Sequence, residues 1–203
     1  MPTPERLSSV LWQRTDRIYL EHGTLDRIED GHILAGVVLY RGRSGPSRFG
    51  YTIQTDESWH SRSVRLDLDE PTGTQTVELA ADAAGSWTRD GVPMELPFPC
   101  QDIDLAISPS TNTLAIRRLA LAVGETGRAH VLWIQVPSFG MRAVEQAYER
   151  IDKTTYRYKG KFGSYKIEVD DNGLVLQYPG GGWHAGAHRA RRAAASRGTV
   201  SRP

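Results

Sequence analysis

The sequence predicts a mainly β protein built on a large, curved antiparallel sheet, a half-barrel or open barrel with one or two helices packed against it. From residue 32 onward, short β-prone segments alternate with clusters of Gly, Pro, Asp and Ser. In one segment Val64, Leu66 and Leu68 alternate with charged residues, which is typical of a sheet with one wet face. Residues 81–87 and 169–175 place Asp or Asn and Gly between such segments, which predicts two hairpins.

The predicted strands and helix follow from these patterns. Strands are expected at 32–40, 48–55, 61–69, 75–81, 102–107, 116–123, 129–136, 154–160, 164–170 and 174–179. A helix is expected at 141–152, where apolar residues recur at steps of three and four. The two hairpins end similar series of strands, so an internal duplication is left open.

Composition and charge limit the partners that we expect. The 203 residues include 25 Lys and Arg against 24 Asp and Glu, a balance that creates no global field for a polyanion. Nucleic acid is therefore not expected as a partner. The single cysteine excludes an internal disulfide, and no apolar run approaches the length of a transmembrane helix. The first 14 residues lack the apolar core of a secretory signal, so we expect a cytoplasmic location.

The domain organisation is expected to be simple. Residues 1–185 form a single β-rich domain, and residues 186–203 form a basic tail rich in Ala and Arg. Because the tail has almost no large apolar side chain, it is expected to be disordered. The alternative is a basic arm that contacts anionic lipid or nucleic acid.

Common catalytic signatures are absent from the sequence. It contains no G-x-S-x-G, no phosphate-binding loop, no G-x-G-x-x-G and no H-E-x-x-H. His184 and His188 have a spacing that suits a metal on a helix, but they lie in a glycine-rich stretch. We therefore expect no metal site and no cofactor. Cys100 is expected to be a buried small hydrophobe, since no base can be named that would activate it as a nucleophile.

Residues 99–121 carry an unusual density of charge for a hairpin. Two strands, 102–107 and 114–121, joined by a turn would place Asp104 opposite Arg117, or opposite Arg118 after a slip of one residue. One arginine falls on each face, so at least one lies against apolar neighbours and needs a partner. Asp104 is the expected partner, and the other arginine is free to hold a phosphate or sugar head group.

The same stretch carries a family resemblance. "CQDIDLAISPSTNTLAIRRLAL", together with the earlier "YTIQTDESWHSRSV" and "GSWTRDG" and the later "VEQAYER" and "GLVLQYPG", resembles the putative glycolipid-binding family, first known as a domain of unknown function. The resemblance runs from about Glu21 to Gly180. It implies a curved sheet similar to the half-barrels of bacterial lipoprotein carriers, and it implies binding of a glycolipid or another amphiphile. It brings no catalytic assignment.

We therefore expect non-enzymatic binding of an amphiphilic ligand, a glycolipid or related lipid, in the concave face of the sheet. Aromatic residues such as Trp133 and Tyr158 could line that site or belong to the core. The predicted ligand-binding residues are Arg117, Arg118, Asp102, Asp104, Asn112, Trp59, Arg62, Trp87 and Tyr178.

Two alternatives remain open. The first is a hydrolase or isomerase that acts on a sugar-containing or amphiphilic metabolite and uses Asp102, Asp104 or Cys100. The second is an interaction protein that recruits a partner through a sheet edge or through the basic tail.

Overall fold

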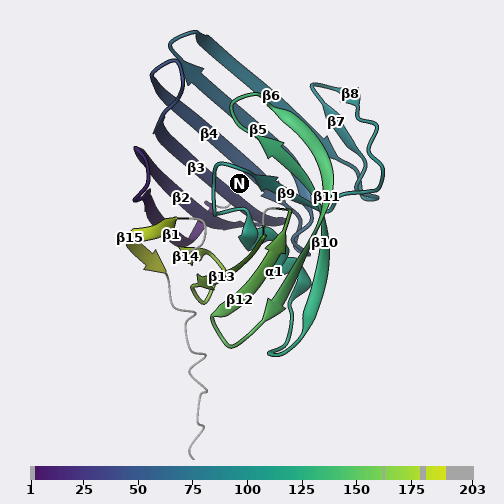
Figure 1. Ribbon diagram of the computed structural model, residues 1–203. Helices are drawn as coiled ribbons and strands as arrows, with labels where there is room; N and C mark the ends of the chain where they lie inside the picture. Colours follow the sequence, from purple (N-terminus) through teal and green to yellow (C-terminus); the bar gives the residue numbers. More distant parts are fainter. Residues whose placement is uncertain (1–2, 162, 179–181, 191–203) are drawn as a thin grey trace, which may run out of the picture.

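The computed structural model describes residues 3–161, 163–178 and 182–190 (Figure 1). Within these ranges the chain forms one sheet of 15 strands and one α-helix, α1 (Asn112–Leu119). The strands before the helix are β1 (Glu5–Arg14), β2 (Tyr19–Ile28), β3 (Gly31–Arg41), β4 (Pro46–Thr55), β5 (Ser61–Glu70), β6 (Gly73–Ala81), β7 (Trp87–Arg89), β8 (Val92–Pro93) and β9 (Asp102–Leu105). The strands after it are β10 (Thr126–Gln135), β11 (Gly140–Arg150), β12 (Thr155–Gly160), β13 (Gly163–Val169), β14 (Val175–Tyr178) and β15 (Trp183–Ala190).

The sheet is open, with β8 and β9 at its two edges. The strand order is β8-β7-β6-β5-β4-β3-β2-β1-β15-β14-β13-β12-β11-β10-β9, and neighbours are antiparallel except for β9, which pairs parallel to β10. The first and last strands of the described chain, β1 and β15, therefore pair in the middle of the sheet. This architecture confirms the predicted mainly β fold with a large antiparallel sheet. No described helix has the length and apolarity that crossing a membrane requires.

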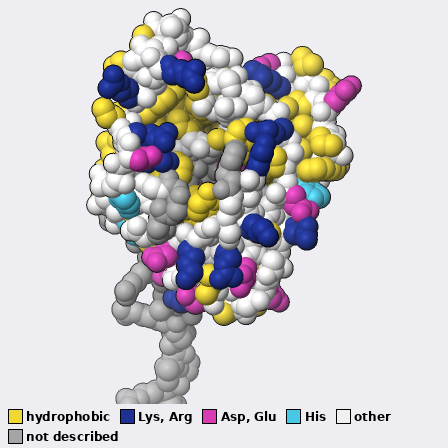
Figure 2. All heavy atoms as spheres, viewed as in Figure 1, with side chains coloured by type: hydrophobic (Ala, Val, Ile, Leu, Met, Phe, Trp, Pro, Cys, Tyr) yellow, Lys and Arg dark blue, Asp and Glu magenta, His cyan; other side chains and the backbone are white. Residues whose placement is uncertain are grey.

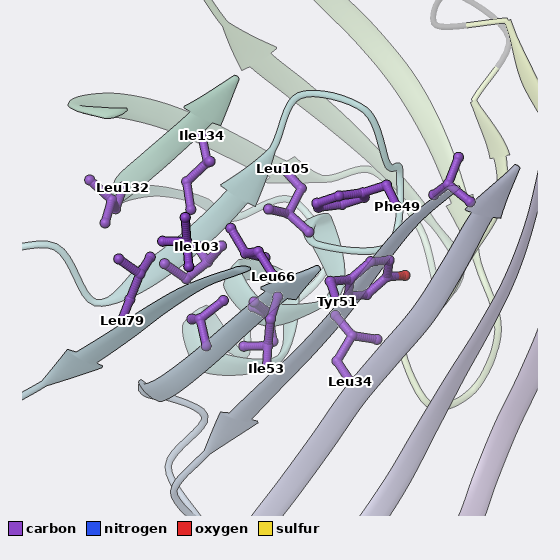
Figure 3. Close-up of a cluster of buried hydrophobic side chains, with 14 of the residues drawn as sticks. Leu34, Phe49, Tyr51, Ile53, Leu66, Leu79, Ile103, Leu105, Leu132 and Ile134 are labelled. Atoms are coloured by element: carbon purple, nitrogen blue, oxygen red, sulfur yellow. The ribbon is translucent and has the colours of Figure 1, made fainter. Parts of the chain in front are cut away.

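Two hydrophobic cores form where the sheet bends around α1 (Figure 1). In the larger core, Leu66 of β5 and Leu79 of β6 lie opposite Ile103 of β9, as Figure 3 shows. The helix contributes Leu114 to this core, whereas Ile116 packs into the second core against strands β10–β14. Side chains therefore occupy much of the concave side, and the helix joins the two halves of the sheet.

The predicted helix at 141–152 is wrong, because residues 141–150 belong to β11 instead. Strand β11 is paired along both edges: Met141 lies opposite Ile134 of β10, and Tyr148 lies opposite Tyr158 of β12. Steps of three and four between apolar residues also occur in strands. Tertiary pairing on both sides overrides the local helical pattern.

The predicted charged hairpin is also wrong. Its first strand is β9, which pairs with β10, and its second strand is the helix α1, so the predicted strand 116–123 does not exist. The helix begins after Thr111 and ends at Leu119, and the capping residue Ala120 has a left-handed φ of 46°. The sequence does carry a helix-start signal, since Pro109 and two hydroxyl residues precede the first turn.

Both predicted hairpin turns are confirmed. The first joins β6 to β7, where the Asp82 backbone N–H donates to the Ser86 carbonyl over 3.0 Å. The second joins β13 to β14, where the Asp170 N–H donates to the Leu174 carbonyl over 2.9 Å. Each turn contains a glycine with positive φ, Gly85 in the first and Gly173 in the second, as the sequence pattern requires.

Strand β15 extends into the segment that the sequence assigns to the tail. Residues 186–190 belong to this strand, and residues 191–203 lie outside the described residues. His184 and His188 therefore lie on a strand rather than in a loop, and His188 Nε2 lies 2.9 Å from Asp170 Oδ2.

Gly23 of β2 is required by a close approach of Trp12. The Trp12 side chain is fully buried, and a Cβ at position 23 would overlap its six-membered ring. Replacing Gly23 by alanine is expected to lower the free energy of unfolding by about 1–3 kcal/mol, because the buried ring has to shift. Chemical denaturation of Gly23→Ala measures this loss. Gly50→Ala is the matched control, since a Cβ there meets only Arg48, at 3.7 Å, and a comparable loss in both variants would contradict the steric explanation.

Candidate functional site

Arg118 and Asp102 form a buried ion pair between α1 and β9. The guanidinium donates from Nε to Asp102 Oδ1 over 3.0 Å and from Nη2 to Oδ2 over 2.7 Å. The Asp102 side chain is 0% exposed and that of Arg118 is 15% exposed. Burial raises the pKa of Asp102, and the hydrogen bonds from Arg118 oppose that rise. Asp102, rather than the predicted Asp104, is therefore the partner that the buried arginine needs.

Hydrogen bonds connect the predicted site residues Arg62 and Trp87 to neighbouring loops. Arg62 donates to Asp56 Oδ2 through Nη2 over 2.6 Å, and the buried Trp87 indole donates to the Cys100 carbonyl over 2.9 Å. Burial, and then the charge of Asp102, raises the pKa of the Cys100 thiol to about 12. A thiol with this pKa is not the thiolate that nucleophilic catalysis needs.

Arg117 and Trp59 form a second cluster on the other side of the helix. The Arg117 guanidinium lies 5.0 Å from the Trp59 ring centroid, and that ring stacks on His32 at 3.7 Å. Burial lowers the pKa of Arg117. Arg117 also lines a cavity of about 260 Å³ together with Arg150 at the end of β11, Tyr156 of β12 and residues of the β13–β14 loop. The two neighbouring arginines thus have different environments.

The remaining predicted residues meet in an aromatic pocket. Asp104, Asn112 and Tyr178 come from β9, α1 and β14, and they line one cavity of about 190 Å³. The other lining residues are Leu105, Ala106, Ser108, Trp133, Tyr158, Tyr165 and Trp183. The cavity is thus walled by aromatic rings from five separate strands, with a carboxylate, an amide and a hydroxyl among them.

The rings of the aromatic pocket support one another. Tyr178 stacks on Trp183 with centroids 5.6 Å apart and planes 28° apart. Tyr165 lies edge-on to Tyr178 at 5.5 Å, and Tyr158 lies 6.4 Å from Tyr165 with nearly parallel planes. Aromatic faces with nearby polar groups are the usual means of orienting a partly apolar ligand such as a sugar ring.

Asp104 is a carboxylate in the pocket wall with neutral partners. It accepts hydrogen bonds from Gln146 Nε2 and, over 3.5 Å, from Thr111 Oγ1. Among the described residues it makes no ion pair with Lys or Arg. Burial raises its pKa to about 6, and the two hydrogen bonds oppose that rise. A ligand hydroxyl that donates to this carboxylate would offset part of its desolvation.

Asn112 is fixed by hydrogen bonds at the other side of the pocket. Its Nδ2 donates to the Pro109 carbonyl over 3.0 Å, and its Oδ1 accepts from the Tyr148 hydroxyl over 3.0 Å. The same hydroxyl lies 3.0 Å from Gln146 Oε1, and Gln146 in turn contacts Asp104. One network therefore orients both polar groups of the pocket.

A buried carboxyl group that sequence reasoning missed lies at Glu21. It is fully buried, and it accepts hydrogen bonds over 2.6 Å from Tyr51 and from Ser108, with a further contact to the Tyr19 hydroxyl. Ser110 Oγ lies 2.8 Å from the Tyr51 hydroxyl. Burial raises the pKa of Glu21 to about 7. Ser108 also lines the aromatic pocket, so this cluster supports the pocket wall.

The aromatic pocket could be found only in part from the sequence. Trp133 and Tyr158 were candidates, whereas Tyr165 and Trp183 were missed. Tyr165 lies directly opposite Tyr158 in the β12–β13 pair, so their cross-strand register is the signal that could have joined them.

On the face shown in Figure 2, hydrophobic side chains line a hollow and basic side chains lie around it.

The fold and pocket define a class of protein: a single open, curved sheet with a helix on its concave side and an aromatic cavity beside that helix. Residues 9–182 match the family described as putative glycolipid-binding, and the chain belongs to this family. The crystal structure of a DUF1089 family protein from Pseudomonas aeruginosa is similar, with 34% sequence identity and a TM-score of 0.73. The match covers 83% of this chain and 92% of that chain. No curated protein matches the chain.

Proposed function

We propose that the protein binds an amphiphilic ligand with a sugar-bearing head, a glycolipid or related lipid, without transforming it. The observation that carries the proposal is the aromatic pocket, where Asp104 and Asn112 lie among rings that can stack on a sugar face. The predicted head-group arginines have other roles in this proposal. Arg118 neutralises Asp102, and Arg117 lies at the separate cavity beside Trp59.

Binding is favoured over hydrolysis by the groups around the pocket. Glycoside hydrolysis ordinarily needs two carboxyl groups that bracket the scissile bond. Asp104 is the one carboxylate among the described residues that line the pocket. Asp102 does not line it and is held by Arg118. The raised pKa of Cys100 disfavours a thiolate nucleophile.

Removing one ring of the pocket is expected to weaken sugar binding. In Tyr178→Ala the loss of stacking should lower the affinity for an octyl glycoside by about three- to tenfold, which corresponds to about 0.5–1.5 kcal/mol. Tryptophan fluorescence titration with octyl glucoside, galactoside and mannoside below their micelle concentrations measures the effect. Native mass spectrometry of the gently purified protein provides an independent search for a bound amphiphile.

Tyr156→Ala is the matched control for this experiment. Tyr156 is buried to a similar extent in the same core as Tyr178, but it does not line the aromatic pocket. Equal loss of affinity in both variants would show a general effect on stability rather than on the pocket. Release of free sugar by the wild-type protein would replace the binding proposal with the hydrolase alternative.

A further inference from the structure

A second concave site lies at the end of the sheet where the β1–β2 and β3–β4 turns meet. It is a groove of about 910 Å³, within the usual range of roughly 300–1,000 Å³ for small-molecule sites. Its walls come from the end of β1, the start of β2, the end of β3 and the start of β4. We call it the turn groove.

Aliphatic side chains on the turn groove are unusually exposed. Ile18, Leu20 and Leu39 are 69%, 40% and 51% exposed, and Leu20 lies directly opposite Leu39 in the β2–β3 pair. In the described part of the chain, the other large hydrophobic side chains with such exposure are Val92 and Val123, which do not line this groove. A contiguous patch of exposed apolar surface on a protein marks a site where a ligand or partner binds.

Arginines border the same groove. Arg14 and Arg17 both contact Asp16, so the local charge of these three residues is positive. Arg41 also lines the groove, and among the described residues it makes no ion pair with a carboxylate. Its backbone N–H donates to the Ile18 carbonyl over 3.3 Å, which places the basic and aliphatic parts of the groove side by side. An apolar surface next to a positive rim is complementary to an anionic amphiphile.

The turn groove and the aromatic pocket are linked by side-chain contacts. Trp183 lines the pocket, and the Arg14 guanidinium lies 4.1 Å from its ring centroid. The Tyr19 ring lies 6.1 Å from the same indole, edge to face. Arg14 and Tyr19 line the groove from the face that carries the pocket, whereas Leu20 and Leu39 line it from the opposite face, because neighbouring residues of a strand alternate in direction. A hydrocarbon chain that starts at the pocket therefore reaches them by passing around the ends of β2 and β3.

We infer that the turn groove takes the hydrocarbon chain of an anionic amphiphile, with a phosphate or other negative group beside Arg41. This inference rests on the proposed function, because it assigns the second half of the same ligand. The chain covers Ile18, Leu20 and Leu39, while the sugar occupies the aromatic pocket. The preferred ligand is therefore a negatively charged glycolipid rather than a neutral one.

Calorimetric titration with decyl phosphate and with octyl and decyl glucoside, all below their micelle concentrations, tests the inference. Each buried methylene contributes about 0.8 kcal/mol, so decyl glucoside should bind more tightly than octyl glucoside by up to roughly fifteenfold. Leu39→Ser should remove most of this gain and weaken decyl phosphate binding about fivefold or more. Val123→Ser, which removes an equally exposed aliphatic side chain elsewhere, should change neither affinity.

The charge of the groove is tested by Arg41→Gln. This variant should weaken decyl phosphate binding severalfold at low salt and leave decyl glucoside binding unchanged, because only the phosphate interacts with the guanidinium. If glucosides bind and depend on Tyr178 but show no effect of chain length or of Leu39→Ser, the groove inference is overturned and the proposed function stands. If Leu39→Ser weakens binding while Tyr178→Ala does not, the groove is upheld and the sugar site is wrong.

Discussion

Replacing Arg118 by methionine is expected to lower the free energy of unfolding by about 3–5 kcal/mol, since it leaves a buried carboxylate without its partner. The Asp102 side chain is 0% exposed, and Arg118 donates three hydrogen bonds to its carboxylate. Because the unpaired carboxyl would favour its protonated form, the loss should be larger at pH 8 than at pH 5. Urea denaturation at the two pH values measures both effects.

The surface pair at Arg65 is the control for this prediction. Arg65 is 52% exposed and pairs with Asp67 and Glu78, so Arg65→Met should lower the free energy of unfolding far less than Arg118→Met does. A double variant, Asp102→Leu with Arg118→Met, should recover most of the stability because no buried charge remains. A loss below about 1 kcal/mol in Arg118→Met at pH 8 would contradict the role of this ion pair.

The stability of the protein is expected to fall between pH 5 and pH 8 because of Glu21. Burial raises its pKa from 4.5 to about 7, so the folded state binds this proton more tightly than the unfolded state does. The contribution of the Glu21 proton to the free energy of unfolding is complete below pH 4.5 and is lost as the pH rises through 7. At about 1.4 kcal/mol per pKa unit, the loss is roughly 3 kcal/mol by pH 8.

The hydrogen bonds around Glu21 agree with a protonated carboxyl. The Tyr19 hydroxyl donates to the Ile107 carbonyl over 2.8 Å and also contacts Glu21. Since a tyrosine has one hydroxyl proton, a protonated Glu21 can donate to the Tyr19 oxygen and satisfy both contacts. Glutamine retains a similar shape and can also donate.

Glu21→Gln should therefore make the pH dependence shallower, most clearly above pH 6, because Asp104, with a pKa of about 6, contributes to the fall below that pH. The variant should also be more stable than the wild type at pH 8. Urea midpoints measured from pH 4.5 to pH 8.5 test this expectation. Glu145→Gln, at an exposed position on β11, is the control and should leave the pH profile unchanged. A Glu21→Gln profile as steep as that of the wild type would show that another group carries the pH dependence.

Most of the sheet could be predicted because alternation of apolar and polar residues is a local signal. Val64, Leu66 and Leu68 face the core along β5 as their spacing predicts. The helix could not be predicted with the same success, since the run from Asn112 to Leu119 is too short to separate a period of 3.6 from a period of 2. Its arginines were therefore assigned to the wrong element.

The site was harder to predict because its residues are close only in the folded chain. Asp104, Asn112 and Tyr178 line one cavity, but they were selected for reasons that included a hairpin that does not exist. The neighbouring rings of Tyr165 and Trp183 come from strands late in the chain, and their positions depend on the register of β12–β13 and β14–β15. Register across long connections is not a local property of the sequence.

The pairing of β1 with β15 has a consequence for how the chain is made. Strands β1–β6 pair in sequence order and can assemble as they emerge during synthesis, whereas one edge of β1 has no partner until β15 is complete. The Trp12 indole likewise donates to the Val175 carbonyl, which is synthesised far later. A nascent chain thus carries an open strand edge through most of its translation, and such edges promote aggregation. Chaperone binding during synthesis would therefore be concentrated on the first strand, although that strand is central in the finished sheet.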